Sequence, residues 1–150
     1  MRRHFRIFLL FLAATLLPVP SAVAAAPDFT GLWLTQDRSG VIEIAPCGEG
    51  LCGRIVGMSQ TRNDDGSVPV DSKGHPMCGL TILTAAMPSD SGESQGRITD
   101  PDNGKVYDSV LSVDAEGRLR LRGYVLTPLL GETQIWTRYA GQTGPDCRMS

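Results

Sequence analysis

The four cysteines are the residues of this chain whose type and spacing most restrict its chemistry. Cys47 and Cys52 are separated by four residues, and Cys78 and Cys147 follow at wider intervals. A zinc site would need a second Cys or His pair at short spacing, but the only histidine beyond the N-terminal segment is His75. A redox pair is typically Cys-x-x-Cys beside a helix. We therefore expect disulfides, with no metal and no cofactor.

The first cysteine pair fits a tight β-hairpin. With residues 49–50 at its tip, Cys47 lies directly opposite Cys52 in a pair outside the backbone hydrogen bonds, with Cα atoms about 4.5 Å apart. The same register places Ile44 opposite Ile55. Because a disulfide tolerates this separation, we expect a Cys47–Cys52 bond.

Cys78 and Cys147 then pair by elimination. An even number of cysteines in an exported chain is typical of disulfides. In the chain-entropy treatment, the short loop between Cys47 and Cys52 is worth about 2 kcal/mol of stability and the loop between Cys78 and Cys147 about 4 kcal/mol. The second disulfide is therefore the one whose loss should cost more.

His75 and two groups of aspartates are the remaining candidates for catalysis. His75 lies in a polar loop, four residues after Asp71. The aspartates gather where turn chemistry itself favours Asp: Asp64, Asp65 and Asp71, then Asp100, Asp102 and Asp108. Neither group has the spacing of a calcium loop, and a single loop histidine is usually solvated. We therefore predict no catalytic residue.

Two segments offer surfaces for a ligand or a partner. Arg118, Arg120 and Arg122 alternate along one expected strand and so share a face, which is typical of the solvated side of a half-buried strand. The connection YVLTPLLGE, residues 124–132, is rich in apolar side chains. An apolar loop at the mouth of a barrel can line a ligand site or contact a partner.

The N-terminus has the features of a secretory signal peptide. Three arginines precede an apolar stretch of about eleven residues, which is too short to span a membrane, and Ala22-Val23-Ala24 supplies a cleavage site. We predict a signal peptide over residues 1–24 and one mature domain over residues 25–150, in the periplasm or secreted. Without the three arginines the chain has 11 basic and 16 acidic residues, and this acidic balance disfavours nucleic acid as a partner.

Short runs of β-branched and aromatic residues, separated by Gly and Pro, predict an all-β domain. The eight expected strands cover residues 31–35, 41–46, 51–57, 79–84, 95–99, 104–113, 118–126 and 131–139. Eight short strands in one small domain are typical of an antiparallel up-and-down barrel, with a β-sandwich as the alternative.

The turn DAEGR sets the register of one hairpin. With Gly117 in the left-handed region, a type I turn places Val113 opposite Leu119 and Leu111 opposite Leu121. This register gathers the apolar side chains on one face of the sheet, and a slip by one residue would scatter them over both faces.

Five motifs run through the mature chain: GLW, CGEGLCGRIVGM, CGLTIL, DPDNGKVYDSVLSV and LRLRGYV…LGETQIWTR. In combination they resemble an uncharacterised bacterial family, domain of unknown function family 2147, from Phe29 to Arg138. Members of this family look like exported or periplasmic single-domain β proteins. The resemblance implies a compartment and a fold, and it brings no settled activity, cofactor or catalytic residue.

A looser resemblance, to lipocalin-like barrels, rests on Gly31-x-Trp33 near the start and Arg138 near the end. In that arrangement an arginine of the last strand covers a tryptophan of the first, and the two strands pair and remove both sheet edges. Trp136 lies two residues before Arg138 and so shares its face. We predict an eight-stranded antiparallel lipocalin-like barrel closed by Trp33, Trp136 and Arg138.

We predict that the protein is a non-enzymatic binding module for a small apolar or amphipathic ligand. The residues expected to line the barrel mouth are Tyr107, Leu126, Leu129 and Leu130. A ligand binder should have an apolar cavity inside the barrel, because an eight-stranded barrel is either filled by its own side chains or holds one small ligand.

Two other functions are open. A protein-binding envelope factor or protease inhibitor would use residues 58–78 or 124–132, and should have a filled barrel and an exposed apolar loop. A hydrolase-like enzyme would be centred on His75 and Asp71, and should have His75 beside an acid and a pocket.

Overall fold

Eight short strands separated by turns form one closed barrel in the computed structural model, which describes residues 27–150. The strands are β1 (Gly31–Leu34), β2 (Gly40–Cys47), β3 (Gly50–Met58), β4 (Thr81–Ala86), β5 (Ser94–Thr99), β6 (Val106–Val113), β7 (Leu119–Tyr124) and β8 (Glu132–Arg138), with a 3₁₀ helix, η1 (Pro128–Leu130), before β8. The predicted all-β, eight-stranded antiparallel barrel is confirmed, and the β-sandwich alternative is wrong. The predicted signal peptide lies outside the described residues.

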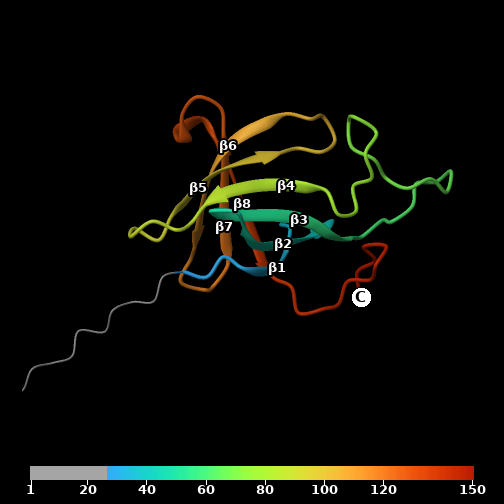
Figure 1. The fold of residues 1–150 in the computed structure, drawn as a ribbon, viewed down its shortest axis with the longest axis horizontal. Helices are drawn as coiled ribbons and strands as arrows, with labels where there is room; N and C mark the ends of the chain where they lie inside the picture. The colour runs from blue at the N-terminus through green and yellow to red at the C-terminus, as the bar shows by residue number, and fades with distance from the viewer. Residues whose placement is uncertain (1–26) are drawn as a thin grey trace, which may run out of the picture.

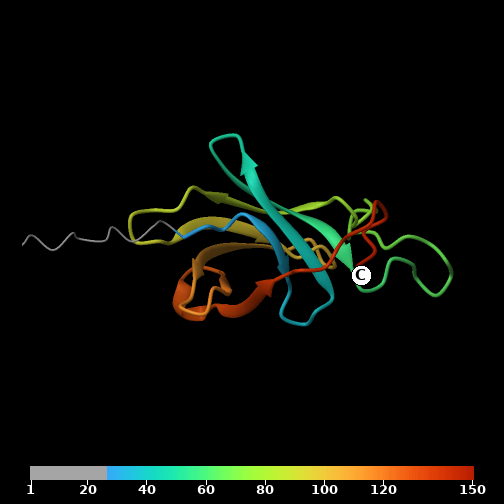
Figure 2. The same ribbon diagram turned by 90° about the horizontal axis from the view of Figure 1, so that it is seen from below.

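The connections of the barrel alternate between its two ends, because consecutive strands run in opposite directions. The β1–β2, β3–β4, β5–β6 and β7–β8 connections lie at one end, which we call the open end, and the other three lie at the closed end. The long β3–β4 connection (green) and the β4–β5 connection (yellow-green) project on opposite sides in Figures 1 and 2.

Large apolar side chains pack inside the barrel into one buried cluster, which includes Phe29, Trp33, Ile44, Leu51, Leu83, Leu111 and Leu119. Trp33 is 0 % exposed, and its Nε1 donates a hydrogen bond to the Phe29 carbonyl at 2.8 Å. The indole therefore buries its ring without leaving its N–H unpaired, as buried polar groups require.

Arg138 covers Trp33 at the seam where the first and last strands meet. The two residues are opposite each other, and the guanidinium carbon lies 3.8 Å from the ring centroid. The same guanidinium donates to the carbonyls of Thr30 and Asp28. Gly31 has a φ of +110°, and a Cβ there would lie 2.8 Å from Arg138 Nη1. The chain thus needs glycine beneath the arginine, both for backbone conformation and for space.

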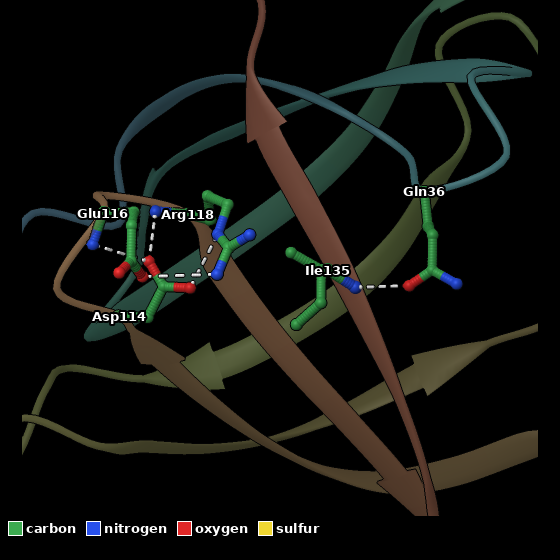
Figure 3. Close-up of polar contacts among 5 residues, drawn as sticks. All are labelled: Gln36, Asp114, Glu116, Arg118 and Ile135. Carbon is green, nitrogen blue, oxygen red and sulfur yellow. Dashed lines mark hydrogen bonds and ion pairs between the residues drawn. The ribbon is translucent and has the colours of Figure 1, made fainter.

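Gln36 continues this seam beyond the last paired residue of β1. Its Oε1 accepts a hydrogen bond from the Ile135 N–H at 2.8 Å (Figure 3). A side chain therefore satisfies a backbone donor of β8 at the point where β1 has already turned towards β2. The contact holds the β1–β2 turn against β8 at the open end.

The β6–β7 hairpin has the predicted register. Val113 is opposite Leu119 and Leu111 is opposite Leu121, and Gly117 has a φ of +76°. The turn residues and the alternation of apolar residues agree here, which is why the register can be derived without tertiary information.

The β2–β3 hairpin carries its disulfide in a register that differs from the predicted one. Its tip is formed by residues 48–49, and Gly48 has a φ of +58°. Cys52 is consequently opposite Ala45, and the direct opposition of Cys47 and Cys52 is wrong. The Cys47–Cys52 bond runs diagonally across the hairpin, with Cα atoms 5.7 Å apart.

The same shift changes the partners of the isoleucines. Ile55 is opposite Ile42, and Ile44 is opposite Gly53, so the predicted pairing of Ile44 with Ile55 is wrong. A shift of two residues leaves every side chain on its own face, since the side-chain period of a strand is two. The apolar pattern therefore fits both registers equally well.

The second disulfide ties the C-terminal tail to the β3–β4 connection. Cys78 and Cys147 are bonded with Cα atoms 5.7 Å apart, and Cys147 is buried. The Cys147 carbonyl also accepts a hydrogen bond from the Met58 N–H at 2.7 Å. The tail is thereby held against the last residue of β3.

Candidate functional site

The open end of the barrel is hollow. A cavity of about 1330 Å³ is bordered by the β1–β2, β3–β4, β5–β6 and β7–β8 connections. Barrels of this size are either filled by side chains or hold a small ligand. In this chain large side chains fill one part of the barrel and leave the other part open to solvent.

The cavity lining is mixed in polarity. Its apolar part is formed by side chains from β2, β3, β4, β5, β7 and β8: Ile42, Ile55, Ile82, Ile98, Leu121 and Trp136. The Trp136 Nε1 donates to Gln134 Oε1 at 2.8 Å. The indole therefore presents an apolar surface while its polar atom has a partner.

Gly123, a small residue on the inner face of β7, helps to keep this space open. Ser109 and Gly123 are opposite each other on β6 and β7. A Cβ at Gly123 would lie 3.7 Å from Tyr107 Cβ and 3.8 Å from Ile98 Cγ2, which are ordinary contact distances. A larger side chain at position 123 would therefore fit and would occupy cavity volume. The buried Ser109 Oγ has no hydrogen-bond partner among residues 27–150.

The rim of the cavity is polar. It includes the amides of Gln36, Gln60 and Asn63. Its charged residues are four acids: Asp37, Asp100, Asp102 and Glu132. An apolar interior below a polar opening is the arrangement expected for an amphipathic molecule that enters with its apolar end first.

The structure separates the four residues predicted to line the mouth. Tyr107 and Leu130 line the cavity, whereas Leu126 and Leu129 do not and are 85 % and 90 % exposed. β7 ends at Tyr124, two residues earlier than predicted, and Leu126 then takes a left-handed φ of +72°. This turn and η1 leave the two leucines in solvent, because a loop has no fixed alternation of faces.

Two of the three alternating arginines, Arg118 and Arg122, have side-chain partners in and beside their own hairpin. Arg118 Nε donates to Asp114 Oδ2 at 2.8 Å and its Nη2 to Glu116 Oε2 at 3.2 Å (Figure 3). Arg122 Nη1 donates to Thr133 Oγ1 at 2.8 Å. These contacts are consistent with a solvated strand face. They also stabilise the β6–β7 and β7–β8 hairpins.

His75 lies beside an acid and a second, smaller cavity of about 270 Å³. Its Nδ1 is 3.1 Å from Asp71 Oδ2, and its side chain is 64 % exposed. Asp71 Oδ1 also accepts the backbone N–H groups of Lys73 and His75, each at 2.8 Å. Within residues 27–150, no hydrogen bond joins His75 to a Ser, Thr or Cys side chain, as activation of a nucleophile requires. The neighbouring acid and pocket expected for the hydrolase-like alternative are both present, and the contacts of Asp71 with His75 also hold this loop together.

The hydrogen bonds to Asp71 predict a contribution to stability that depends on pH. The His75 backbone N–H lowers the pKa of the Asp71 carboxyl most; desolvation raises it, but the His75 side chain and the Lys73 N–H lower it further, so the pKa lies below its ordinary 3.8. The contribution is therefore present above pH 3.8 and is lost as the pH falls through the lowered folded-state pKa.

Urea unfolding at a series of acidic pH values tests this. For Asp71→Asn, the slope of the free energy of unfolding against pH should be smaller below pH 4 than for the parent. The matched control is Asp64→Asn, which removes an exposed carboxylate of the same connection and should leave the slope unchanged. Identical slopes for the two variants would contradict the prediction.

Among residues 27–150, no three His, Cys, Asp or Glu side chains are grouped so that they could hold a metal ion. The same part of the chain has no helix of sufficient length and hydrophobicity to cross a membrane.

The strands that build the cavity also identify the family. The family profile described as "Uncharacterized protein conserved in bacteria (DUF2147)" matches residues 31–138, from the first residue of β1 to the last residue of β8. This chain belongs to the DUF2147 family. The resemblance inferred from its motifs is thereby confirmed, and the match covers every strand that contributes to the cavity of this DUF2147 protein.

One solved structure shares the fold. It is described as "Protein HP1028 from the human pathogen Helicobacter pylori belongs to the lipocalin family" and is 16 % identical to this chain. The alignment covers 75 % of this chain and 84 % of that chain, with a TM-score of 0.57. At this identity the likeness concerns the fold, and it supports the lipocalin-like architecture. No curated protein matches the chain.

Proposed function

We propose that this DUF2147 protein is a non-enzymatic binding module that holds a small apolar or amphipathic molecule in the open end of its barrel. The observation that supports the proposal is the cavity of about 1330 Å³, with apolar walls below a polar rim. Ligand sites in proteins are typically concave and mostly apolar, with a few polar groups that orient the ligand.

We also propose that the protein acts in the periplasm or outside the cell. Its two disulfides, Cys47–Cys52 and Cys78–Cys147, suit an oxidising compartment. The signal peptide predicted over residues 1–24 supplies a route to that compartment.

Gly123→Leu tests the proposal by filling the cavity. The new side chain starts between Tyr107 and Ile98 at ordinary contact distances, and replacing a strand glycine should not weaken the strand. We expect the variant to remain folded and to bind a neutral apolar dye, N-phenylnaphthylamine, about tenfold more weakly or worse, equivalent to about 1.4 kcal/mol. Dye fluorescence during titration measures the affinity.

The matched control is the double variant Leu126→Ser/Leu129→Ser. It removes two apolar side chains that are exposed and lie outside the cavity lining, so dye affinity should stay at the parent value. The proposal would be wrong if the parent did not bind the dye, or if Gly123→Leu bound it as tightly as the parent.

A protein-binding role is the second candidate function. The apolar tip of the β7–β8 connection favours it, since four large side chains are exposed there: Val125, Leu126, Leu129 and Leu130. Exposed apolar patches commonly mark contacts with a partner or with a membrane. Val125 and Leu130 also line the cavity, whereas Leu126 and Leu129 do not. The double serine variant at 126 and 129 therefore alters the tip without changing the cavity lining, and so separates the two roles.

A further inference from the structure

The charged side chains that line the cavity all have the same sign. Four carboxylates line it, from the β1–β2 turn, the β5–β6 connection and the first residue of β8: Asp37, Asp100, Asp102 and Glu132. Within residues 27–150, no Lys, Arg or His lines the cavity, and none of these four carboxylates forms an ion pair. A molecule that enters therefore meets carboxylates that have no cationic partner in direct contact.

Two of the carboxylates are held in place by neutral donors of their own turns. Asp37 Oδ1 accepts hydrogen bonds from Thr35 Oγ1 at 2.7 Å and from the Ser39 N–H at 3.1 Å. Asp100 accepts bonds from the turn that follows it in the same way. Neutral donors fix the position of a carboxylate without cancelling its charge, so these groups keep their charge at the rim.

Glu132 differs from these aspartates because it lies on a strand. It is opposite Gly123, which lines the cavity, so the two residues belong to the same face of the sheet. In the described part of the chain, no ion pair holds its carboxylate. Glu132 therefore faces the opening of the cavity from a strand position, and its exposed carboxylate is accessible to a molecule that enters.

Aromatic rings line the same space. Tyr107, Tyr124 and Trp136 contribute to the cavity surface. A cation is attracted both by the faces of such rings and by carboxylates, and a cleft lined by charges of one sign concentrates the opposite charge. An anionic head group would meet repulsion at the rim with no cationic side chain among the lining residues.

We propose that the cavity selects amphipathic molecules whose polar head is cationic, such as an organic ammonium on an apolar tail. The head lies at the rim beside Asp37 and Glu132, and the tail lies against the apolar walls. The inference rests on the proposed function, because it specifies the class of ligand for the same cavity.

Competition among three ligands with the same tail tests the inference. Decylammonium, decanol and decanoate displace the neutral dye N-phenylnaphthylamine from the purified protein at neutral pH and an ionic strength of about 0.1 M, where the Debye length is about 10 Å. We expect decylammonium to bind about tenfold more tightly than decanoate, with decanol between them, since a partly solvated charge contact is worth a few-fold in affinity. Added salt should reduce the difference in affinity between decylammonium and decanoate, because it screens the charges.

Two variants distinguish a rim effect from the net charge of the protein. Asp37→Asn/Glu132→Gln should reduce the gap between the cationic and anionic ligands to about twofold or less. The control, Asp90→Asn/Glu93→Gln, removes the same number of charges from the β4–β5 connection at the closed end. It should leave the gap unchanged, because charges beyond a Debye length are screened.

The outcomes separate the inference from the proposed function. If all three ligands displace the dye equally, or decanoate is preferred, the cationic preference is overturned and binding in the cavity stands. A gap that shrinks equally in both double variants also overturns the preference. If neither the dye nor any of the three ligands binds, the proposed function fails and the inference fails with it.

Discussion

Replacing Cys78 and Cys147 together by alanine is expected to lower the free energy of unfolding by about 4 kcal/mol. The disulfide joins residues 69 positions apart, and removing a crosslink that closes so long a loop restores the largest share of chain entropy to the unfolded state. Cys147 is also buried, so the variant loses packing as well. Because domains are typically stable by 5–15 kcal/mol, this loss is large.

Urea unfolding of matched variants measures the effect. Cys47→Ala/Cys52→Ala, which opens a loop with a sequence separation of 5, should cost about 2 kcal/mol. An equal cost for the two double variants, or a larger cost for the hairpin disulfide, would contradict the prediction. The longer bond also affects the candidate site, since Met77, the residue before Cys78, lines the cavity.

Trp33→Ala is expected to cost about 4 kcal/mol of the free energy of unfolding. The side chain is fully buried, and truncation of a buried tryptophan loses both its transfer free energy and the packing around the space that it leaves. The Phe29 carbonyl would lose the indole N–H, and Arg138 would lose the ring that it covers. The loss falls on the seam that closes the barrel.

Two milder variants divide this cost and remain informative if Trp33→Ala does not fold. Trp33→Phe keeps a ring beneath Arg138 and should cost about 1–2 kcal/mol, mainly through the unpaired Phe29 carbonyl. Arg138→Gln keeps the core intact and should cost about 1 kcal/mol. Denaturant unfolding measures all three, and a cost below about 1 kcal/mol for Trp33→Ala would exclude a structural role for the seam.

Local signals were sufficient to predict the strands. All eight strands lie where β-branched runs between Gly and Pro place them, and their ends differ from the expected ranges by at most two residues. Whether a segment forms a strand depends on the alternation of apolar and polar residues and on the turn residues at its ends. Both can be identified from positions close together in the sequence. The β6–β7 register was predictable for the same reason, because Gly117 and the apolar alternation allow only one solution.

The β2–β3 register was not predictable in this way. Two glycines flank Glu49, and either can occupy a left-handed turn position. The two resulting registers differ by two residues, so they give identical faces. A disulfide spans the diagonal as readily as the direct pair. Only the structure, with residues 48–49 at the tip, distinguishes them.

The candidate site was predicted only in part. Tyr107 lies on β6, where the alternation of a strand fixes whether a side chain points inward or outward, and it lines the cavity. Leu126 and Leu129 were assigned to the mouth on hydrophobicity alone, which does not specify the direction of a loop side chain. The walls at Ile42, Ile98 and their neighbours could have been found by combining the alternation with the end of the barrel that each residue occupies.

The amino-acid sequence alone determined the class of the fold, the number and order of its strands, and the family, because these depend on local periodicity, turn chemistry and short motifs. The tertiary structure decided that the open end is hollow, since a cavity depends on the summed volume of side chains from seven strands. It also decided that four acids from three separate segments of the sequence line one opening. The position of an acidic residue in the sequence does not show which other residues lie near it. These residues become neighbours only when the barrel closes and brings alternate connections to the same end.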